Sequence, residues 1–103
     1  MEQQTKVAIR QNVALRSPSD YAVIIWNDDI TTMDFVVSVL TKVFHKAPQE
    51  AAALMMDVHE KGHGIAGVYT YDIAVSKKAR ADAMSMEKGF PLVLTLEEIA
   101  HEA

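Results

Sequence analysis

The chain has 103 residues, half of them hydrophobic, with 14 acidic and 10 basic side chains and a formal net charge of -4. This length suits one domain, and the apolar residues are too dispersed to give the run of about 18 or more that a membrane-spanning helix needs. The acidic balance disfavours nucleic acid as a partner, and the absence of cysteine excludes disulfides, thiolate nucleophiles and thiolate metal sites.

Residues 1–19 are predicted to form a flexible N-terminal extension, and residues 20–103 a single core domain. The first 17 residues mix charged and isolated apolar side chains and lack the continuous apolar segment of a signal peptide, which favours a cytoplasmic location. The extension is expected to end in the polar stretch around Pro18, which is typical of a turn or linker.

The segment Tyr21–Trp26 is dense in β-branched and aromatic side chains, and its length favours a strand buried on both faces. Polar residues 27–29 end this strand. A helix is predicted next, with Thr31 and Asp34 forming a weak capping box at its start. Its apolar residues recur at helical spacing until about His45.

A second helix is predicted to begin at Pro48, which fits a first helical position, and to stop at Gly62. A short strand over Ile65–Thr70, a helix over Asp72–Lys88 and a last strand over Leu92–Leu96 follow. This order and the short connections predict an α+β fold, in which a small three-stranded antiparallel sheet packs against three helices.

The segment from His59 to His63 matches the H-E-x-x-H pattern, in which two histidines one helical turn apart bind zinc and the glutamate acts as a base. Taken alone, the pattern indicates a zinc hydrolase. The geometry requires an unbroken helix through both histidines, whereas Gly62 and Gly64 put His63 at or beyond the helix end. We therefore expect His63 to be a loop residue, and we expect no resident metal or cofactor.

Asn27, Asp28 and Asp29 place one amide and two carboxylates at the exit of a buried strand, where the scaffold can aim side chains at a ligand. Such a cluster attracts a cation. The alternative is ordinary turn chemistry, because Asn and Asp commonly bond to the backbone between a strand and a helix. No nucleophile or partner base lies nearby in the sequence, so no enzyme activity is predicted.

Met55 lies one helical turn before His59, so the two side chains share a helix face. Methionines at helical spacing usually fill cores, although flexible thioethers such as those of Met33, Met55 and Met56 also line pockets that accept several shapes. The basic cluster at residues 77, 78 and 80 is interpreted as a solvated helix face.

Four ordered blocks of this sequence resemble the ClpS family of protease adaptors. Ile24–Val36 carries the N-D-D triplet followed by T-T-M-D-F-V, Leu54–Gly62 is similar to the second helix of the family, Gly67–Thr70 continues the pattern, and residues 90–97 match the closing strand. The resemblance covers roughly residues 20–98. Ile30 stands where an aromatic residue is common, and Thr32 where proline is common.

The resemblance implies an adaptor that binds proteins with a bulky N-terminal Leu, Phe, Tyr or Trp and delivers them to a Clp AAA+ unfoldase and its protease. A polar set would bind the N-terminal amine, namely Asn27, Asp28, Asp29 and His59. An apolar set would form a side-chain pocket, namely Thr31, Met33, Val36, Met55, Val58 and Leu92. Asp72 and Lys77 would dock on the N-terminal domain of a ClpA-like unfoldase, while residues 1–19 engage the unfolding machine.

Two other functions remain open from the residues alone. The first is a small protein–protein interaction module of similar fold with another partner, against which the N-D-D triplet and the Met–His pairing argue. The second is the zinc hydrolase through His59 and His63.

Overall fold

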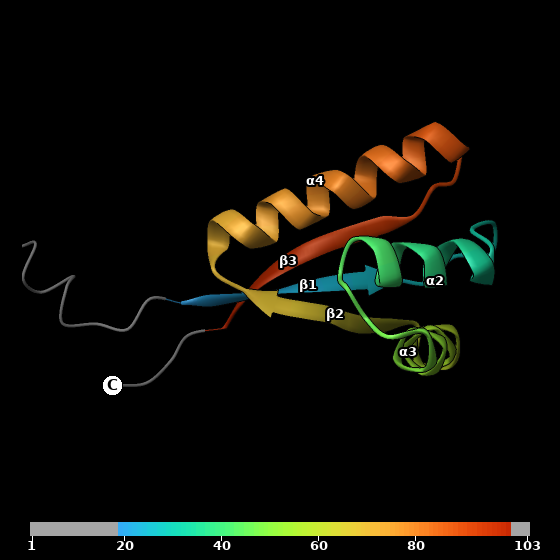
Figure 1. The fold of residues 1–103 in the computed structure, drawn as a ribbon, viewed down its shortest axis with the longest axis horizontal. Helices are drawn as coiled ribbons and strands as arrows, with labels where there is room; N and C mark the ends of the chain where they lie inside the picture. Colours follow the sequence, from blue (N-terminus) through green and yellow to red (C-terminus); the bar gives the residue numbers. More distant parts are fainter. Residues whose placement is uncertain (1–18, 100–103) are drawn as a thin grey trace, which may run out of the picture.

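The computed structural model describes residues 19–99, which form three strands and three helices in the predicted order (Figure 1). The strands are β1 (Asp20–Trp26), β2 (His63–Tyr69) and β3 (Val93–Ile99), and the helices are α2 (Met33–Lys42), α3 (Pro48–Lys61) and α4 (Tyr71–Lys88). The predicted α+β class is confirmed. The predicted extension at residues 1–19 lies, except for its last residue, outside the described residues. Within the described range, no helix is long and apolar enough to cross a membrane.

The sheet has the strand order β2-β1-β3, and β1 is antiparallel to both neighbours. Asp20 pairs with Ile99 at one end of the sheet, and Trp26 pairs with Val93 at the other. The register between β1 and β2 shifts after Val23, where β2 carries a bulge. Figure 1 shows α2 and α3 gathered at the end of the sheet where β1 finishes, with α4 running along its length.

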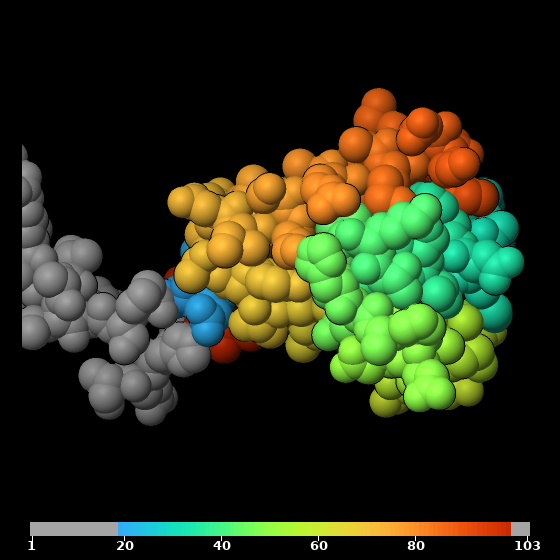
Figure 2. Space-filling model, viewed as in Figure 1, coloured from blue at the N-terminus to red at the C-terminus, as the bar shows by residue number. Residues whose placement is uncertain are grey.

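One face of the sheet packs against the helices and forms the core. Val23 and Ile25 are fully buried there, together with Val39 and Leu40 of α2. Helix α3 contributes Ala51 and Val58, and α4 contributes its buried alanines. Seen from the same side in space-filling form, the three helices make one continuous surface (Figure 2).

The opposite face of the sheet carries the alternate residues of β1 and their cross-strand neighbours. Ala22 and Ile24 are buried, but Trp26 is exposed, and its indole Nε1 donates a 2.8 Å hydrogen bond to the Thr95 hydroxyl. Its ring lies 5.1 Å from the His63 ring, centroid to centroid. The first strand is thus buried as predicted over Ala22–Ile25, whereas Tyr21 is half-buried and Trp26 faces outward with this aromatic pair.

Helix α2 begins one residue later than the sequence suggested. Its N-cap is Thr32, whose hydroxyl accepts a hydrogen bond from the Phe35 N–H, so the predicted cap at Thr31 is wrong. The cap moves because the Thr31 hydroxyl donates to Asp28 instead. The helix ends at Lys42 rather than near His45, which adopts a left-handed conformation with φ of 57°.

Helix α3 has the predicted start at Pro48 and stop at Gly62. The Glu50 carboxylate accepts from the Ala47 N–H at the start. At the end Gly62 has φ of 94°, a left-handed conformation that glycine adopts without a Cβ penalty. The chain then turns directly into β2, so His63 is a strand residue and not the loop residue that was predicted.

Candidate functional site

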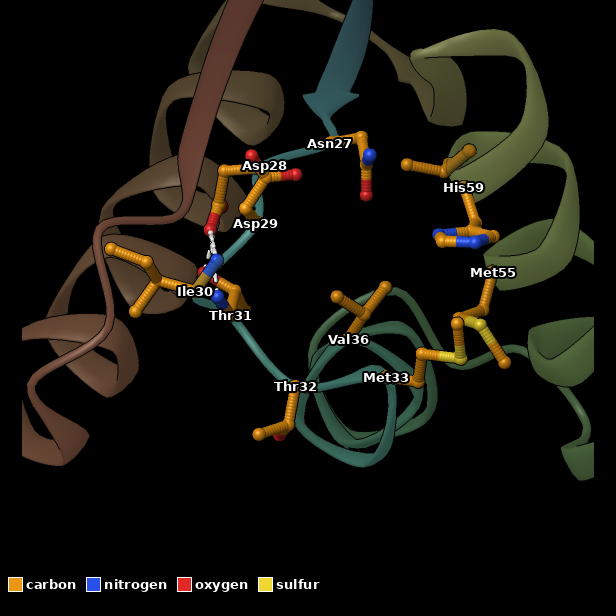
Figure 3. Close-up of a pocket in the computed structure, with 11 residues that line it drawn as sticks. Asn27, Asp28, Asp29, Ile30, Thr31, Thr32, Met33, Val36, Met55 and His59 are labelled. Carbon is orange, nitrogen blue, oxygen red and sulfur yellow. Dashed lines mark hydrogen bonds between the residues drawn. The ribbon is translucent and has the colours of Figure 1, made fainter.

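A cavity of about 330 Å³ opens at the end of the sheet where β1 finishes (Figure 3). Three elements supply its walls: the loop over residues 27–32, the first turn of α2 and the last two turns of α3. Its lining residues are Asn27, Asp28, Asp29, Ile30, Thr31, Thr32, Met33, Val36, Met55, Val58 and His59. The volume lies at the lower end of the range of about 300 to 1,000 Å³ that is typical of ligand pockets, so the cavity suits one side chain better than a large ligand.

A main-chain hydrogen bond joins two of these walls. The Asn27 N–H donates to the Gly62 carbonyl over 2.9 Å, which ties the loop after β1 to the end of α3. The carbonyl that accepts this bond belongs to Gly62, where α3 ends in a left-handed conformation. The glycine that stops the helix therefore also sets the distance between the loop and the helix across the pocket.

Asp28 uses its carboxylate to shape the loop. One oxygen accepts from the N–H groups of Ile30 (2.8 Å) and Thr31 (2.6 Å), and the other accepts from the Thr31 hydroxyl (2.7 Å). Partial burial alone would raise the pKa of Asp28, but the hydrogen bonds from Thr31 and Ile30 outweigh it and hold the pKa below its ordinary value. Asp28 is thus ionised and committed to the turn.

Asn27, Asp29 and His59 form the polar part of the pocket. In Figure 3, Asn27 and Asp29 extend from the loop and His59 extends from α3, above the apolar side chains. The Asp29 carboxylate is exposed and has no hydrogen-bond or ion-pair partner within residues 19–99. A carboxylate and an amide oxygen are therefore free to accept hydrogen bonds from a ligand at this rim.

The apolar part of the pocket lies below the polar rim. Val36 and Val58 are buried and form its floor, whereas Met33 is 43% exposed and Met55 is half-buried at the mouth. Figure 3 shows the Met33 and Met55 side chains pointing toward one another from α2 and α3. The methionines interpreted from sequence as core filler are divided: Met33 and Met55 line the pocket, while Met56 does not.

Of the ten residues predicted for amine and side-chain binding, nine line this one cavity, and Leu92 does not. Leu92 is buried in the hydrophobic core just before β3. Sequence reasoning assigned no ligand contact to Ile30 and Thr32, which also line the cavity. The available signal was their position between residues that were already assigned.

The zinc reading of the H-E-x-x-H pattern is contradicted. His59 lies in the last turn of α3, but Gly62 ends that helix and His63 turns into β2, where its ring stacks on Trp26. The two imidazoles therefore do not share the helix face that the zinc geometry requires. Within the part of the chain that the structure describes, no group of three or more His, Cys, Asp or Glu side chains could hold a metal ion.

Asp72 and Lys77, predicted as docking residues, lie on α4 beside a separate shallow cavity. Asp72 is exposed in the first turn of the helix. The Lys77 ammonium donates a 2.9 Å hydrogen bond to the Val43 carbonyl and lies 5.5 Å from the centre of the Tyr69 ring. Lys78 forms a 2.7 Å salt bridge with Asp82. Lys77 thus departs from the solvated face that the sequence suggested, whereas Lys78 forms its pair at the surface and Arg80 is exposed.

Comparison with known proteins gives consistent matches. The family model for "ATP-dependent Clp protease adaptor protein ClpS" matches residues 16–95. The ClpS adapter of Acetivibrio thermocellus is 50% identical over 94% of this chain and 98% of its own, and that of Clostridium acetobutylicum is 45% identical over 88% and 90%. Among solved structures, Agrobacterium tumefaciens ClpS2 bound to L-phenylalaninamide has a TM-score of 0.77 and 36% identity, covering 81% of this chain and all of that one.

Proposed function

Because this chain belongs to the ClpS family of ATP-dependent Clp protease adaptors, we propose that its pocket receives the N-terminal residue of proteins destined for degradation. The chain is an adaptor and not an enzyme. The ligand class is a polypeptide with a free amine and a bulky N-terminal Leu, Phe, Tyr or Trp. The observation that carries this proposal is the Asp29 carboxylate, which has no partner among residues 19–99 and lies beside an apolar cavity of side-chain size.

An N-terminal residue presents an ammonium group next to its own side chain, and the pocket has a matching division. Asn27, Asp29 and His59 accept or share the hydrogen bonds of the ammonium, and Asp28 acts indirectly by fixing the loop. A charge-assisted hydrogen bond contributes about 1.5 to 3 kcal/mol. The relative from Agrobacterium tumefaciens supports this assignment, because phenylalaninamide also carries a free amine beside an aromatic side chain.

The apolar wall selects the side chain. Burying one large apolar side chain between Met33, Met55 and the two valines gains about 1.5 to 3 kcal/mol, before the cost of ordering the peptide. Small or charged N-terminal residues gain none of this. We therefore expect a Kd in the micromolar range for the favoured class, which corresponds to a binding free energy of about -8 kcal/mol.

Delivery is proposed to follow the family pattern. The proposed partner is the N-terminal domain of a ClpA-like unfoldase, with Asp72 and Lys77 at the interface. Residues 1–19 are proposed to engage the unfolding machine. The anchored Lys77 ammonium favours Asp72 as the more available contact of the pair. The cytoplasmic location stays a prediction.

The test compares a Leu-initiated peptide with its N-acetylated twin by fluorescence anisotropy. Acetylation removes the charge and most of the donors at once, so binding should fall steeply. Asp29→Ala should weaken the free-amine peptide at least tenfold, or about 1.4 kcal/mol, and the acetylated peptide little.

The matched control is Asp57→Ala, which removes an exposed carboxylate of α3 that does not line the pocket. It should leave both affinities unchanged. If Asp29→Ala weakens both peptides equally, or neither, the carboxylate does not recognise the amine and the assignment of this rim is wrong.

A further inference from the structure

Three soft or borderline donor groups meet at the mouth of the pocket. Met55 and His59 are one turn apart on α3 and share a face of that helix. Met33 begins α2 on the facing wall, and Figure 3 shows its thioether extending toward that of Met55, below the His59 ring. All three side chains line the same cavity.

The chemistry of this donor set is distinctive. Thioether sulfur is a weak hydrogen-bond acceptor but a good ligand for soft cations, and imidazole binds the same ions. None of the three side chains has a hydrogen-bond partner within residues 19–99, so their donor atoms remain available. Methionine has three rotatable bonds, which let each sulfur turn onto an ion without movement of the backbone.

We propose that Met33, Met55 and His59 form a binding site for a soft monovalent metal ion, Cu(I) or Ag(I). Two thioethers and one imidazole select such ions over Zn(II), Mg(II) and Ca(II), which prefer harder or anionic donors. The hard oxygens of Asn27 and Asp29 lie on the other wall of the pocket, in the loop after β1.

A metal ion at this position occupies the mouth through which a peptide side chain enters. The ion and the peptide therefore compete, and raising the metal concentration turns the adaptor off. This competition rests on the proposed function, whereas the metal site itself does not.

The other methionines of the described range provide contrast. Met86 is 82% exposed and Met56 is 42% exposed, and neither lines the pocket. Met84 borders a different cavity between α2 and α4, which is lined by Lys42, Arg80, Lys88 and Glu87 and by no second methionine or histidine of the described range. If exposure decided reactivity toward a soft metal ion, Met86 would react first. If the arrangement of donor atoms decides it, Met33 and Met55 react first.

The test uses the full chain with isotope-labelled methionine methyl groups, titrated with Ag(I) as a redox-stable probe. The Met33 and Met55 methyl resonances should shift together at the lowest silver concentration, while those of Met56 and Met86 remain in place. In chelator competition with Cu(I) under ascorbate, Met33→Leu and Met55→Leu should each weaken binding at least tenfold, whereas Met56→Leu should match the native protein.

A response that follows exposure, with Met86 first, overturns the site, as does a native affinity in Met55→Leu. The methyl titration needs no substitution, so it decides the question even if a variant folds poorly.

A final arm adds a Phe-initiated peptide. Ag(I) should displace it from the native protein, and Zn(II) should not. A protein that binds the peptide but shows no silver shift at Met33 and Met55 overturns this inference and leaves the proposed function intact. A protein that shows the shift but binds no peptide supports the metal site and overturns the proposed function instead.

Discussion

Asn27, Asp28 and Asp29 are consecutive polar residues that have different partners. The Asn27 N–H donates to the Gly62 carbonyl, and the Asp28 carboxylate accepts three hydrogen bonds from the loop. The Asp29 carboxylate has no partner in the part of the chain that the structure describes. The two alternatives that the triplet left open, turn chemistry and cation binding, thus fall on different residues. Asp28 serves the turn, and Asp29 is available to a ligand.

Replacing Asp28 tests the first role through its pH dependence. Its folded pKa is depressed, so the ionised carboxylate contributes stability above its unfolded pKa of about 4, and this contribution is lost as the pH falls through the folded pKa. Asp28→Asn keeps an oxygen that can accept from the two N–H groups but removes the charge. Its free energy of unfolding at pH 7 should be lower than that of the native protein by up to about 1 kcal/mol.

Urea unfolding of both proteins across a pH series measures this difference. The difference should shrink as the pH falls below about 4, because the unfolded carboxylate then takes up a proton while the native one is still ionised. It should stop changing once the native carboxylate is protonated as well. A difference that stays constant from neutral to acidic pH would mean that the charge of Asp28 does not stabilise the loop.

At the scale of elements, sequence predicted best where a residue type leaves the backbone few alternatives. Pro48 and Gly62 bound α3 as expected, because proline lacks the N–H and glycine accepts the left-handed turn. The start of α2 was placed wrongly because both Thr31 and Thr32 can cap a helix. The choice depends on the Asp28 carboxylate, a contact that residue spacing does not reveal.

Packing across the molecule decided what local patterns left open. Leu92 precedes β3, and sequence alone does not decide whether its apolar side chain lines a pocket or joins the core. The structure buries it in the core. The pairing of His63 with Trp26 depends on the register of two strands that are distant in sequence. Four blocks of family resemblance nevertheless identified nine residues of one cavity, because a pocket built mainly from one loop and two adjacent helices is nearly local in sequence.

Substitution of Gly62 tests the link between helix end and pocket. A Cβ at this position meets no atom within 4 Å, so the cost of Gly62→Ala comes from its φ of 94° and not from a clash. We expect a loss of about 1 to 2 kcal/mol in the free energy of unfolding, with weaker peptide binding because the Asn27 bond is strained. Gly62→Asn is the matched control, since asparagine tolerates left-handed conformations better. Equal losses of stability in the two variants would mean that the left-handed conformation of Gly62 is not the cause.

At the scale of the whole molecule, the core and the pocket draw on residues between Ala22 and Leu94. The first and last residues of the sheet, Asp20 and Ile99, pair with each other at the end away from the pocket. The pocket thus belongs to the folded unit over residues 19–99, and the proposed docking residues of α4 line a separate cavity.

Deleting residues 1–17 separates these two activities. The truncated protein should bind a Leu-initiated peptide within about twofold of the full chain and unfold at the same temperature, because it keeps every core and pocket residue of the described range 19–99. Degradation of a model substrate by the unfoldase and protease should slow. A large loss of peptide affinity would place the domain boundary earlier than residue 20.

The hydrogen bond between the Asn27 N–H and the Gly62 carbonyl has a kinetic consequence. Because main chain joins the loop to the end of α3, this bond opposes separation of these two walls. We expect association rates to vary little among peptides with different hydrophobic N-terminal residues, and differences in affinity to appear as differences in residence time. On the proposed function, we therefore expect the fit of a single side chain to set how long the adaptor holds each cargo.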